Sequence, residues 1–230
     1  MIDPTLRRFP LAYVEDLSAP VLSASSRRHL TGPLRLGPGD PVNVADGLGG
    51  WAPAVLTDDD AGVAVTGPVV MTPPSSVVLT VMFTPTKGVK PEWVVQKLTE
   101  LGIDRIGILQ TERSVVSYDR GRAERLLRKL QTVVTEACQQ SRRLIRPEIL
   151  GPKSVQELVS QNPETRLCDP AGDVFKTAMG SDSLITSLAI GPEGGWSPAE
   201  AEHARLVALP GGILRAETAA ITAAVVLVSQ

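Results

Sequence analysis

The chain has 230 residues, of which 43% are hydrophobic and 21% charged, and its formal net charge at pH 7 is −2. This composition is that of a globular protein with a sizeable core, and the length allows one large domain or two smaller ones. No uncharged apolar run reaches the roughly 18 residues of a membrane span, and the first residues lack a signal-peptide pattern. We therefore expect a cytoplasmic protein without a membrane segment.

Residues that commonly bind metal ions are few. The two cysteines, Cys138 and Cys168, and the two histidines, His29 and His203, do not occur at metal-ligand spacing. We expect free thiols, no metal site and no Ser-His-Asp chemistry.

The first part of the chain reads as short strands separated by turns. β-rich runs at 41–45, 51–56 and 62–66 alternate with Pro-Gly, Asp-Gly and Gly-Gly turn signals. This spacing predicts a small all-β barrel. Paired prolines in TPPSS (72–76) then indicate an extended linker, so we expect one domain over residues 1–72 and a second over 73–230.

The second part alternates strands and helices. Apolar runs predict strands at 77–83, 105–109, 166–169 and 183–191, and helical periodicity predicts helices at 91–101 and 121–140. This alternation is typical of an α/β domain with a mostly parallel sheet.

A cluster of basic residues lies between Arg113 and Arg146. The segment has three acidic residues against nine basic ones, namely Arg113, Arg120, Arg122, Arg125, Arg128, Lys129, Arg142, Arg143 and Arg146. On charge alone, an anionic partner and a solvated helix face are about equally favoured.

The sequence GPEGG, residues 191–195, lies between a predicted strand and a predicted helix start. Ser197 and Glu200 have the spacing of a capping box, with Pro198 at the first helical position. Sheets of this class place ligands at the carboxyl ends of strands, and glycines allow close approach of the backbone. The loop matches neither a Walker motif nor a dinucleotide fingerprint, so spacing alone leaves both a structural turn and a ligand loop open.

The last segment, LPGGILRAETAAITAAVVLVSQ (209–230), has a second Gly-Gly turn followed by an Ala- and Val-rich helix. Arg215 and Glu217 stand where that helix begins. A functional role and a plain capping role for Glu217, at the positive end of the helix, both remain possible.

Two motifs in combination resemble the RsmE family of ribosomal RNA methyltransferases, in the SPOUT superfamily. They are AIGPEGGWSPAE (189–200) and ILRAETAAITAAVVL (213–227). Two further segments are similar to that family as well: KGVKPEWVVQKLTELGIDRIGILQTERSVV (87–116) and EACQQSRR (136–143). The resemblance covers both expected domains.

The resemblance implies an α/β SPOUT domain with a deep trefoil knot, preceded by a small PUA-like β-barrel that binds RNA. It implies that the knot holds S-adenosylmethionine. The cofactor-binding residues would then be Ile190, Gly191, Pro192, Glu193, Gly194, Gly195, Leu209, Leu214 and Arg215.

The implied reaction transfers a methyl group to N3 of a uridine in 16S ribosomal RNA, on the assembled 30S subunit. N3 of uracil carries a proton at neutral pH, so the enzyme must remove it or stabilise the resulting anion. The candidate catalytic residues are Glu112, Arg113, Arg215 and Glu217.

The resemblance also implies contacts with RNA and with a second copy of the chain. The candidate RNA-binding residues are Arg7, Arg8, Arg27, Arg28, Gln140, Arg142 and Arg143. Arg142 departs from the family pattern, which usually has glycine there. The apolar last helix is compatible with a homodimer interface and equally with an intramolecular core.

Two alternative functions remain open at this stage. One is another SPOUT methyltransferase, acting on a ribose 2′-hydroxyl or on transfer RNA. The other is an RNA-binding assembly factor that has lost catalysis.

Overall fold

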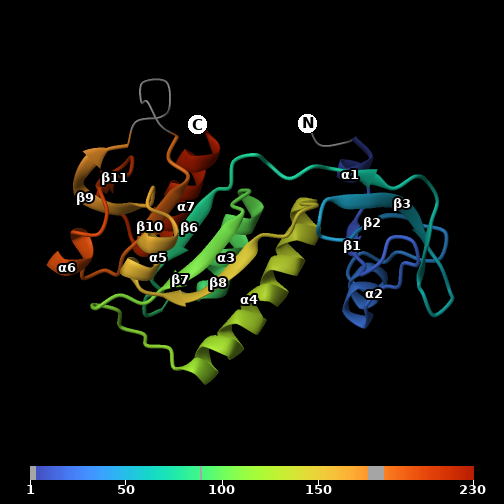
Figure 1. Cartoon of the computed structure of the whole chain (residues 1–230). Helices are drawn as coiled ribbons and strands as arrows, with labels where there is room; N and C mark the ends of the chain where they lie inside the picture. Colours follow the sequence, from blue (N-terminus) through green and yellow to red (C-terminus); the bar gives the residue numbers. More distant parts are fainter. Residues whose placement is uncertain (1–3, 89, 176–183) are drawn as a thin grey trace. The chain divides into compact units, whose positions relative to one another are not determined.

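The computed structural model describes residues 4–88, 90–175 and 184–230, and the chain divides into two compact units (Figure 1). The first unit comprises residues 1–75 together with 135–146, and the second comprises 76–134 together with 147–230. This division differs from the expected boundary between residues 72 and 73 mainly because the segment 135–146 belongs to the first unit.

The first unit contains a five-stranded sheet. Its strands are β1 (Leu11–Tyr13), β2 (Pro41–Ala45), β3 (Gly50–Leu56), β4 (Val63–Val65) and β5 (Val70–Met71). The order is β1-β2-β3-β4, with β5 paired to β3, and all pairs except the parallel β1–β2 pair are antiparallel. Two helices, α1 (Pro4–Arg8) and α2 (Ala24–Thr31), correct the expectation of an all-β domain. Ser23 starts α2 by accepting a hydrogen bond from the Ser26 amide.

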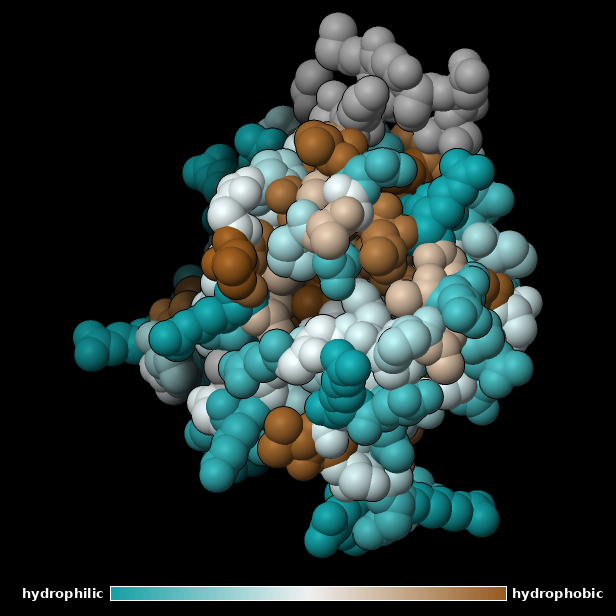
Figure 2. Space-filling model, turned by 90° about the vertical axis from the view of Figure 1, so that its left-hand side faces the viewer, coloured by the Kyte–Doolittle hydropathy of each residue, from teal (hydrophilic) through white to brown (hydrophobic). Residues whose placement is uncertain are grey.

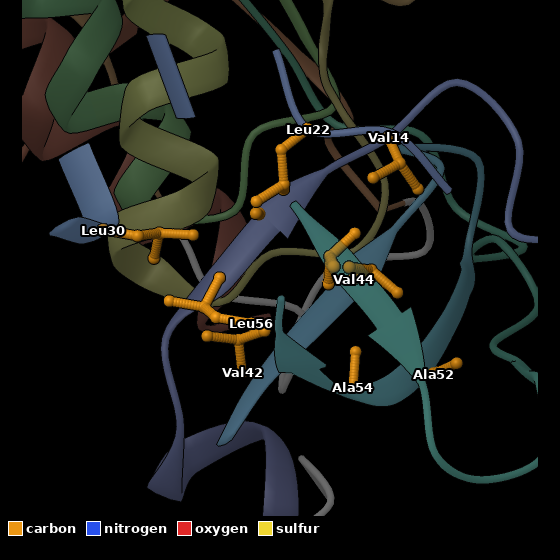
Figure 3. Packing of buried hydrophobic residues seen from close by; sticks show 10 residues of the cluster. Val14, Leu22, Leu30, Val42, Val44, Ala52, Ala54 and Leu56 are labelled. Carbon is orange, nitrogen blue, oxygen red and sulfur yellow. The ribbon is translucent and has the colours of Figure 1, made fainter. Parts of the chain in front are cut away.

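Aliphatic side chains form the core of the first unit, as the scarcity of aromatic residues requires. Figure 3 shows them converging from strands, helix α2 and loops. The cluster consists of Ala12, Val14, Leu22, Leu30, Val42, Val44, Ala52, Ala54, Leu56 and Val63.

The segment 135–146 is attached to the first unit by Tyr13 and by the β2–β3 turn. The Tyr13 hydroxyl donates a hydrogen bond to the Arg143 carbonyl at 2.5 Å, and the Arg146 guanidinium lies 4.8 Å from the Tyr13 ring centroid. Arg146 also donates to the Asp46 carbonyl at 3.0 Å. Burial raises the pKa of Tyr13 well above its usual value, so its hydroxyl stays a donor.

The second unit contains a six-stranded sheet in which every pairing is parallel, as predicted. The strand order is β11 (Leu206–Ala208), β9 (Arg166–Val174), β10 (Ser187–Ile190), β6 (Thr80–Phe83), β7 (Arg105–Leu109) and β8 (Glu148–Lys153). Of these strands, β8 and β11 were not predicted, and they are the two edge strands.

The helices associated with this sheet are α3 (Pro91–Glu100), α4 (Arg120–Ser141), α5 (Val155–Gln161), α6 (Pro198–Ala201) and α7 (Ala216–Val228). Helix α4 begins in the second unit and ends in the first. Helix α7 packs against α3, β6 and β10. Within the described ranges, none of the helices is both long and apolar enough to cross a membrane.

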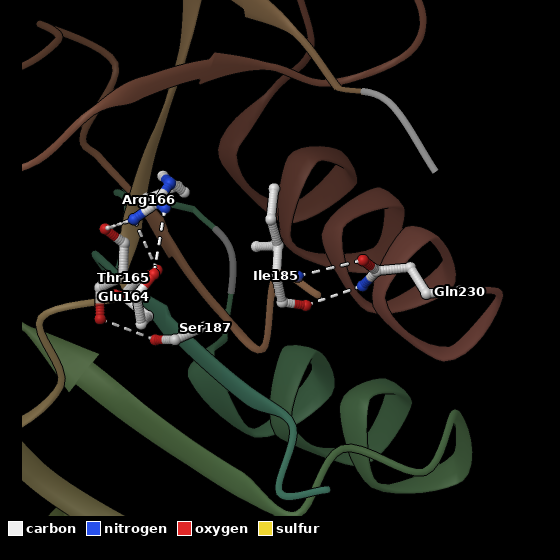
Figure 4. A network of polar contacts seen from close by, with 6 residues as sticks. All are labelled: Glu164, Thr165, Arg166, Ile185, Ser187 and Gln230. Atoms are coloured by element: carbon white, nitrogen blue, oxygen red, sulfur yellow. Dashed lines mark hydrogen bonds and ion pairs between the residues drawn. The ribbon is translucent and has the colours of Figure 1, made fainter. Parts of the chain in front are cut away.

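Polar side chains form hydrogen bonds near the amino-terminal ends of β9 and β10. Gln230 forms a two-way pair with the backbone of Ile185, donating to its carbonyl at 2.7 Å and accepting from its amide at 3.2 Å (Figure 4). Nearby, the buried hydroxyls of Thr165 and Ser187 lie 2.9 Å apart, at the start of β9 and β10. Buried polar groups in this region are therefore paired.

Arg142, the residue after the end of helix α4, has a left-handed backbone conformation with φ of 60°. Glycine is favoured in that conformation because it has no Cβ, so an arginine there is strained. Arg142 compensates by folding back: its guanidinium donates to the carbonyls of Gln139 at 2.5 Å and Gln140 at 3.4 Å. A cation at the carboxyl end of a helix also interacts favourably with the helix dipole.

We expect Arg142→Ala to lower the free energy of unfolding by about 1 kcal/mol, because it removes these hydrogen bonds and keeps the strained backbone. Arg142→Gly also removes the hydrogen bonds but relieves the strain, so it should be more stable than Arg142→Ala by about 1 kcal/mol. Urea unfolding of the three proteins measures both differences. Equal stability of the alanine and glycine variants would contradict the left-handed assignment.

Candidate cofactor and RNA site

The site begins with the register of three neighbouring parallel strands. Ile190, the last residue of β10, pairs with Phe83 at the end of β6 on one side and with Cys168 of β9 on the other. Strand β9 then continues to Val174 beside β11, while β10 stops. The chain leaving β10 therefore has open space next to the continuing part of β9, at the sheet edge where ligands bind in this fold class.

A cavity of about 180 Å³ occupies this position. Three segments form it: residues 168–170 of β9, residues 190–196 after β10, and residues 209–219 after β11. Its lining residues are Cys168, Asp169, Pro170, Ile190, Gly191, Pro192, Glu193, Gly195, Trp196, Leu209, Gly212, Ile213, Leu214, Ala216 and Ala219.

Seven of the nine predicted cofactor residues line this cavity, and Gly194 and Arg215 do not. The Gly194 carbonyl instead accepts a hydrogen bond from Arg113 at 2.8 Å. Arg215 is exposed at the N-cap position of α7 and makes no side-chain capping bond. The lining residues that the sequence analysis missed come from β9 and from further positions within or next to the two quoted motifs.

The position of Trp196 accounts for one of the glycines in residues 191–195, the glycine loop. The Trp196 indole N–H donates to the Cys168 carbonyl at 3.0 Å, and its ring lies against Gly191. A Cβ on Gly191 would lie 3.0 Å from that ring. Gly195 has φ of 70°, whereas Gly194 has neither constraint. Two of the three glycines are thus required by the geometry of the loop itself.

The lining is mostly apolar and includes two acidic residues: Asp169, whose Oδ1 accepts from the Ala171 amide at 2.9 Å, and the exposed Glu193. Cys168 is a free thiol, as expected. Burial raises its pKa, and the Asp169 charge acts in the same direction, so the thiol is neutral at physiological pH. The cavity therefore favours a ligand with apolar surface and positive charge.

Glu112 and Arg113 lie on a tight turn after β7, the 111–114 turn. Ser114 closes this turn, because its hydroxyl accepts from the Thr111 amide at 2.8 Å. The side chains of Glu112 and Arg113 are exposed. The turn is joined to the glycine loop side of the cavity through Arg113 and through a bond from the Glu112 amide to the Glu200 carboxylate at 2.9 Å.

Glu217 lies in the first turn of α7 and lines a small second hollow. Ala216 lines both this hollow and the cavity, so the two are adjacent. The remaining lining residues are Phe83, Thr84, Pro85, Thr86, Pro91 and Val94. The Thr84 hydroxyl is buried there, with Thr84 1% exposed, and finds no hydrogen-bond partner within the described part of the chain. Glu217, whose carboxylate is an acceptor, and Thr84, whose hydroxyl is a donor, are thus the polar members of a lining that is otherwise largely apolar.

All seven predicted RNA-binding residues belong to the first unit, because the segment 135–146 does. Arg7, Arg8, Arg28 and Gln140 are exposed. Arg27 donates to the Asp59 carbonyl, and Arg143 donates to the Ile145 carbonyl at 2.8 Å. The exposed members are therefore better placed for contacts with phosphates than Arg142 and Arg143.

The surface of the second unit is mixed in polarity. Figure 2 shows one face of the molecule, on which hydrophobic side chains form separate groups among hydrophilic ones. Ile213 is 93% exposed although it belongs to the cavity lining.

Among residues 4–88, 90–175 and 184–230, no group of three or more His, Cys, Asp or Glu side chains could hold a metal ion.

Comparison with known proteins adds three findings. A family model described as an RNA methyltransferase domain matches residues 73–228. The chain is 33% identical over 215 residues to ribosomal RNA small subunit methyltransferase E of Synechocystis sp. (strain ATCC 27184 / PCC 6803 / Kazusa), covering 86% of this chain and 69% of the relative. It is 34% identical over 155 residues to the protein of the same name from Bacillus subtilis (strain 168), and the match spans 60% of each.

The fold is also found in a crystal structure of ribosomal RNA small subunit methyltransferase E from Neisseria gonorrhoeae bound to S-adenosyl methionine. The TM-score is 0.79 at 26% sequence identity, and the match covers 96% of this chain and 98% of that one.

We expect Gly195→Ala to lower the free energy of unfolding by about 1 kcal/mol, because alanine is strained at φ of 70°. Gly212→Ala is the matched control: Gly212 also lines the cavity, but a Cβ there meets nothing within 4 Å. Chemical denaturation of both variants measures the difference. A cost for Gly212→Ala as large as that for Gly195→Ala would contradict the assigned loop conformation.

Proposed function

The chain belongs to the RNA methyltransferase family, and on that premise we propose that it transfers a methyl group from S-adenosylmethionine to N3 of a uridine in 16S ribosomal RNA, on the 30S subunit. The observation that carries this proposal is the cavity at the carboxyl ends of the parallel strands, lined by both family motifs. The activity of the Synechocystis and Bacillus relatives, as their names state it, supplies the substrate class.

The lining of the cavity fits S-adenosylmethionine, which supplies an activated methyl group on a sulfonium. Ile190, Leu209, Leu214 and Trp196 offer apolar surface for an adenine ring. Asp169 and Glu193 offer negative charge for the sulfonium and the ammonium group. Backbone N–H groups of the glycine loop would donate to polar atoms of the cofactor, apart from that of Gly195, which donates to the Pro192 carbonyl at 2.9 Å.

We assign the second unit to the SPOUT class with a deep trefoil knot, and the first to the PUA-like RNA-binding class. Supporting the knot, residues 190–196 and 209–219 line one cavity, and α7 then packs back onto α3, β6 and β10. Supporting an RNA-binding role of the first unit, it collects the exposed side chains of Arg7, Arg8 and Arg28. These charges would fix the position of the RNA backbone.

The protein is proposed to act as a homodimer in the cytoplasm. Helix α7 supports a dimer. One side of this apolar helix packs against the sheet, and Val225 and Val228 remain exposed and available to a second copy. The exposed Ile213 on the cavity rim is a further apolar residue available to a second copy.

Removal of the N3 proton requires an acceptor close to the transferred methyl group. Glu112 and Glu217 are the two proposed acceptors. Glu217 is better placed, because it is half-buried beside the hollow that adjoins the cavity, whereas the side chain of Glu112 is exposed. Arg113 and Arg215, both exposed, would stabilise negative charge on the RNA.

We expect Glu217→Gln to lower kcat by on the order of 100-fold, because the amide cannot accept the proton. Affinity for S-adenosylmethionine should change little. The activity of this variant should rise with pH more steeply than that of the wild type, since ionisation of N3 in solution replaces the missing base. Glu112→Gln, measured in the same assay, should slow transfer much less. The reverse order of the two variants would assign the role of base to Glu112.

The proposed reaction is tested by reverse transcription across small-subunit ribosomal RNA from cells with and without the protein. Methylation at N3 blocks Watson–Crick pairing, so we expect a polymerase stop at one uridine in the presence of the protein. The stop should vanish on deletion and return when purified protein and S-adenosylmethionine are added to 30S subunits.

An unchanged stop pattern would contradict methylation at N3. Binding of S-adenosylmethionine would then direct the search to a ribose 2′-hydroxyl or to transfer RNA. RNA binding without cofactor binding would indicate a non-catalytic assembly factor.

A further inference from the structure

Two short helices of the second unit begin with the same capping box. Ser154 and Glu157 start α5, and Ser197 and Glu200 start α6. In each case the serine hydroxyl accepts from the amide of the glutamate, and the glutamate carboxylate accepts from the amide of the serine, at 2.8 Å in α5 and 2.9 Å in α6. Glu157 and Glu200 therefore have the same role in capping the start of their helices.

They differ in the use of the second carboxylate oxygen. Glu157 is exposed, and its carboxylate accepts hydrogen bonds from Ser154 alone, through one oxygen. Glu200 is 7% exposed, and its Oε1 accepts a hydrogen bond from the Glu112 amide at 2.9 Å, 88 residues away in sequence. Its Oε2 accepts from Ser197. A buried carboxylate is costly unless it is hydrogen-bonded, and here each oxygen has a backbone donor.

A second bond joins the same two segments. Arg113 donates to the carbonyl of Gly194 at 2.8 Å. The 111–114 turn is thus attached at two points to the stretch 191–200, which contains the glycine loop and the start of α6. We call these two bonds the latch. One side of the latch carries Glu112 and Arg113, and the other side belongs to the stretch whose neighbouring residues 191–193, 195 and 196 line the cavity.

We propose that Glu200 is a positioning residue that couples the cofactor cavity to the 111–114 turn. The inference rests on the proposed function, because it assigns the cavity to S-adenosylmethionine and the turn to the RNA side. Ordering of the glycine loop by a ligand stabilises the latch, and the latch fixes the backbone of Glu112 and Arg113. Because such coupling is reciprocal, a change in the turn also alters affinity in the cavity.

The chemistry of Glu200 makes the coupling specific to a carboxylate. Glutamine at this position has one acceptor oxygen and can satisfy one of the two amides, so it retains either the cap or the bond to Glu112. Alanine satisfies neither amide. The variants should therefore rank in the order wild type, Glu200→Gln, Glu200→Ala.

The test compares four variants: Glu200→Ala, Glu200→Gln, Ser114→Ala and, as the control, Glu157→Ala. Ser114→Ala removes the side-chain hydrogen bond of the 111–114 turn, keeps the backbone bond from the Ser114 amide to the Thr111 carbonyl, and leaves the cavity lining unchanged. Glu157→Ala removes the matched capping box and no long-range bond. Calorimetry measures the Kd of S-adenosylhomocysteine, and methyl transfer to 30S subunits from cells lacking the protein gives kcat and KM. Thermal melting confirms that each variant is folded.

We expect Glu200→Ala to weaken S-adenosylhomocysteine binding on the order of tenfold and to lower kcat as well. Glu200→Gln should lie between this variant and the wild type. Ser114→Ala should weaken binding several-fold, and Glu157→Ala should leave Kd, kcat and KM as in the wild type. If Glu200→Ala does not fold, the comparison of Ser114→Ala with Glu157→Ala decides.

Two results would overturn the inference while leaving the proposed function intact: wild-type affinity in both Glu200→Ala and Ser114→Ala, or an equal loss in Glu157→Ala. Failure of the wild-type protein to bind S-adenosylhomocysteine is a different outcome. It would overturn the proposed function itself, and the role of the latch with it.

Discussion

Parallel pairing of β9, β10 and β6 is the constraint on which the site depends. Because the strands run in one direction, Phe83, Ile190 and Cys168 lie at one level of the sheet, and the segments that follow them emerge on the same side. Strand β10 ends at that level while β9 continues beside β11. The cavity lies where this difference in strand length leaves room beside β9, and the glycine loop forms one of its walls.

Local chemistry was readable from the sequence, and tertiary relations were not. Strand β7 and the capping box of Ser197 and Glu200 were predicted because they depend on neighbouring residues alone. The edge strands β8 and β11 were missed, because partly exposed strands lack a continuous apolar run. Helices α1 and α2 were missed, although Ser23 before α2 is a residue type that favours the N-cap position.

The candidate site shows the same limit. Both cofactor motifs were identified, but Cys168 and Asp169 enter the cavity through the sheet register and not through any motif. The packing of Trp196 on Gly191 and the second bond of Glu200 link residues whose relation no spacing reveals. The three glycines of the loop also differ: Gly191 lies against an indole ring, Gly195 adopts a positive φ, and Gly194 has neither constraint.

The first unit is discontinuous in sequence, since it needs residues 135–146 as well as 1–75. During synthesis the ribosome therefore releases the strands β6 and β7 and most of α4 before the first unit can be completed. The contacts of Tyr13 with Arg143 and Arg146 can form only after these two arginines have been synthesised. Domains usually fold in order from the amino terminus. In this chain, completion of the first unit depends on a segment that is synthesised after much of the second unit, so we expect the two units to fold together and not one after the other.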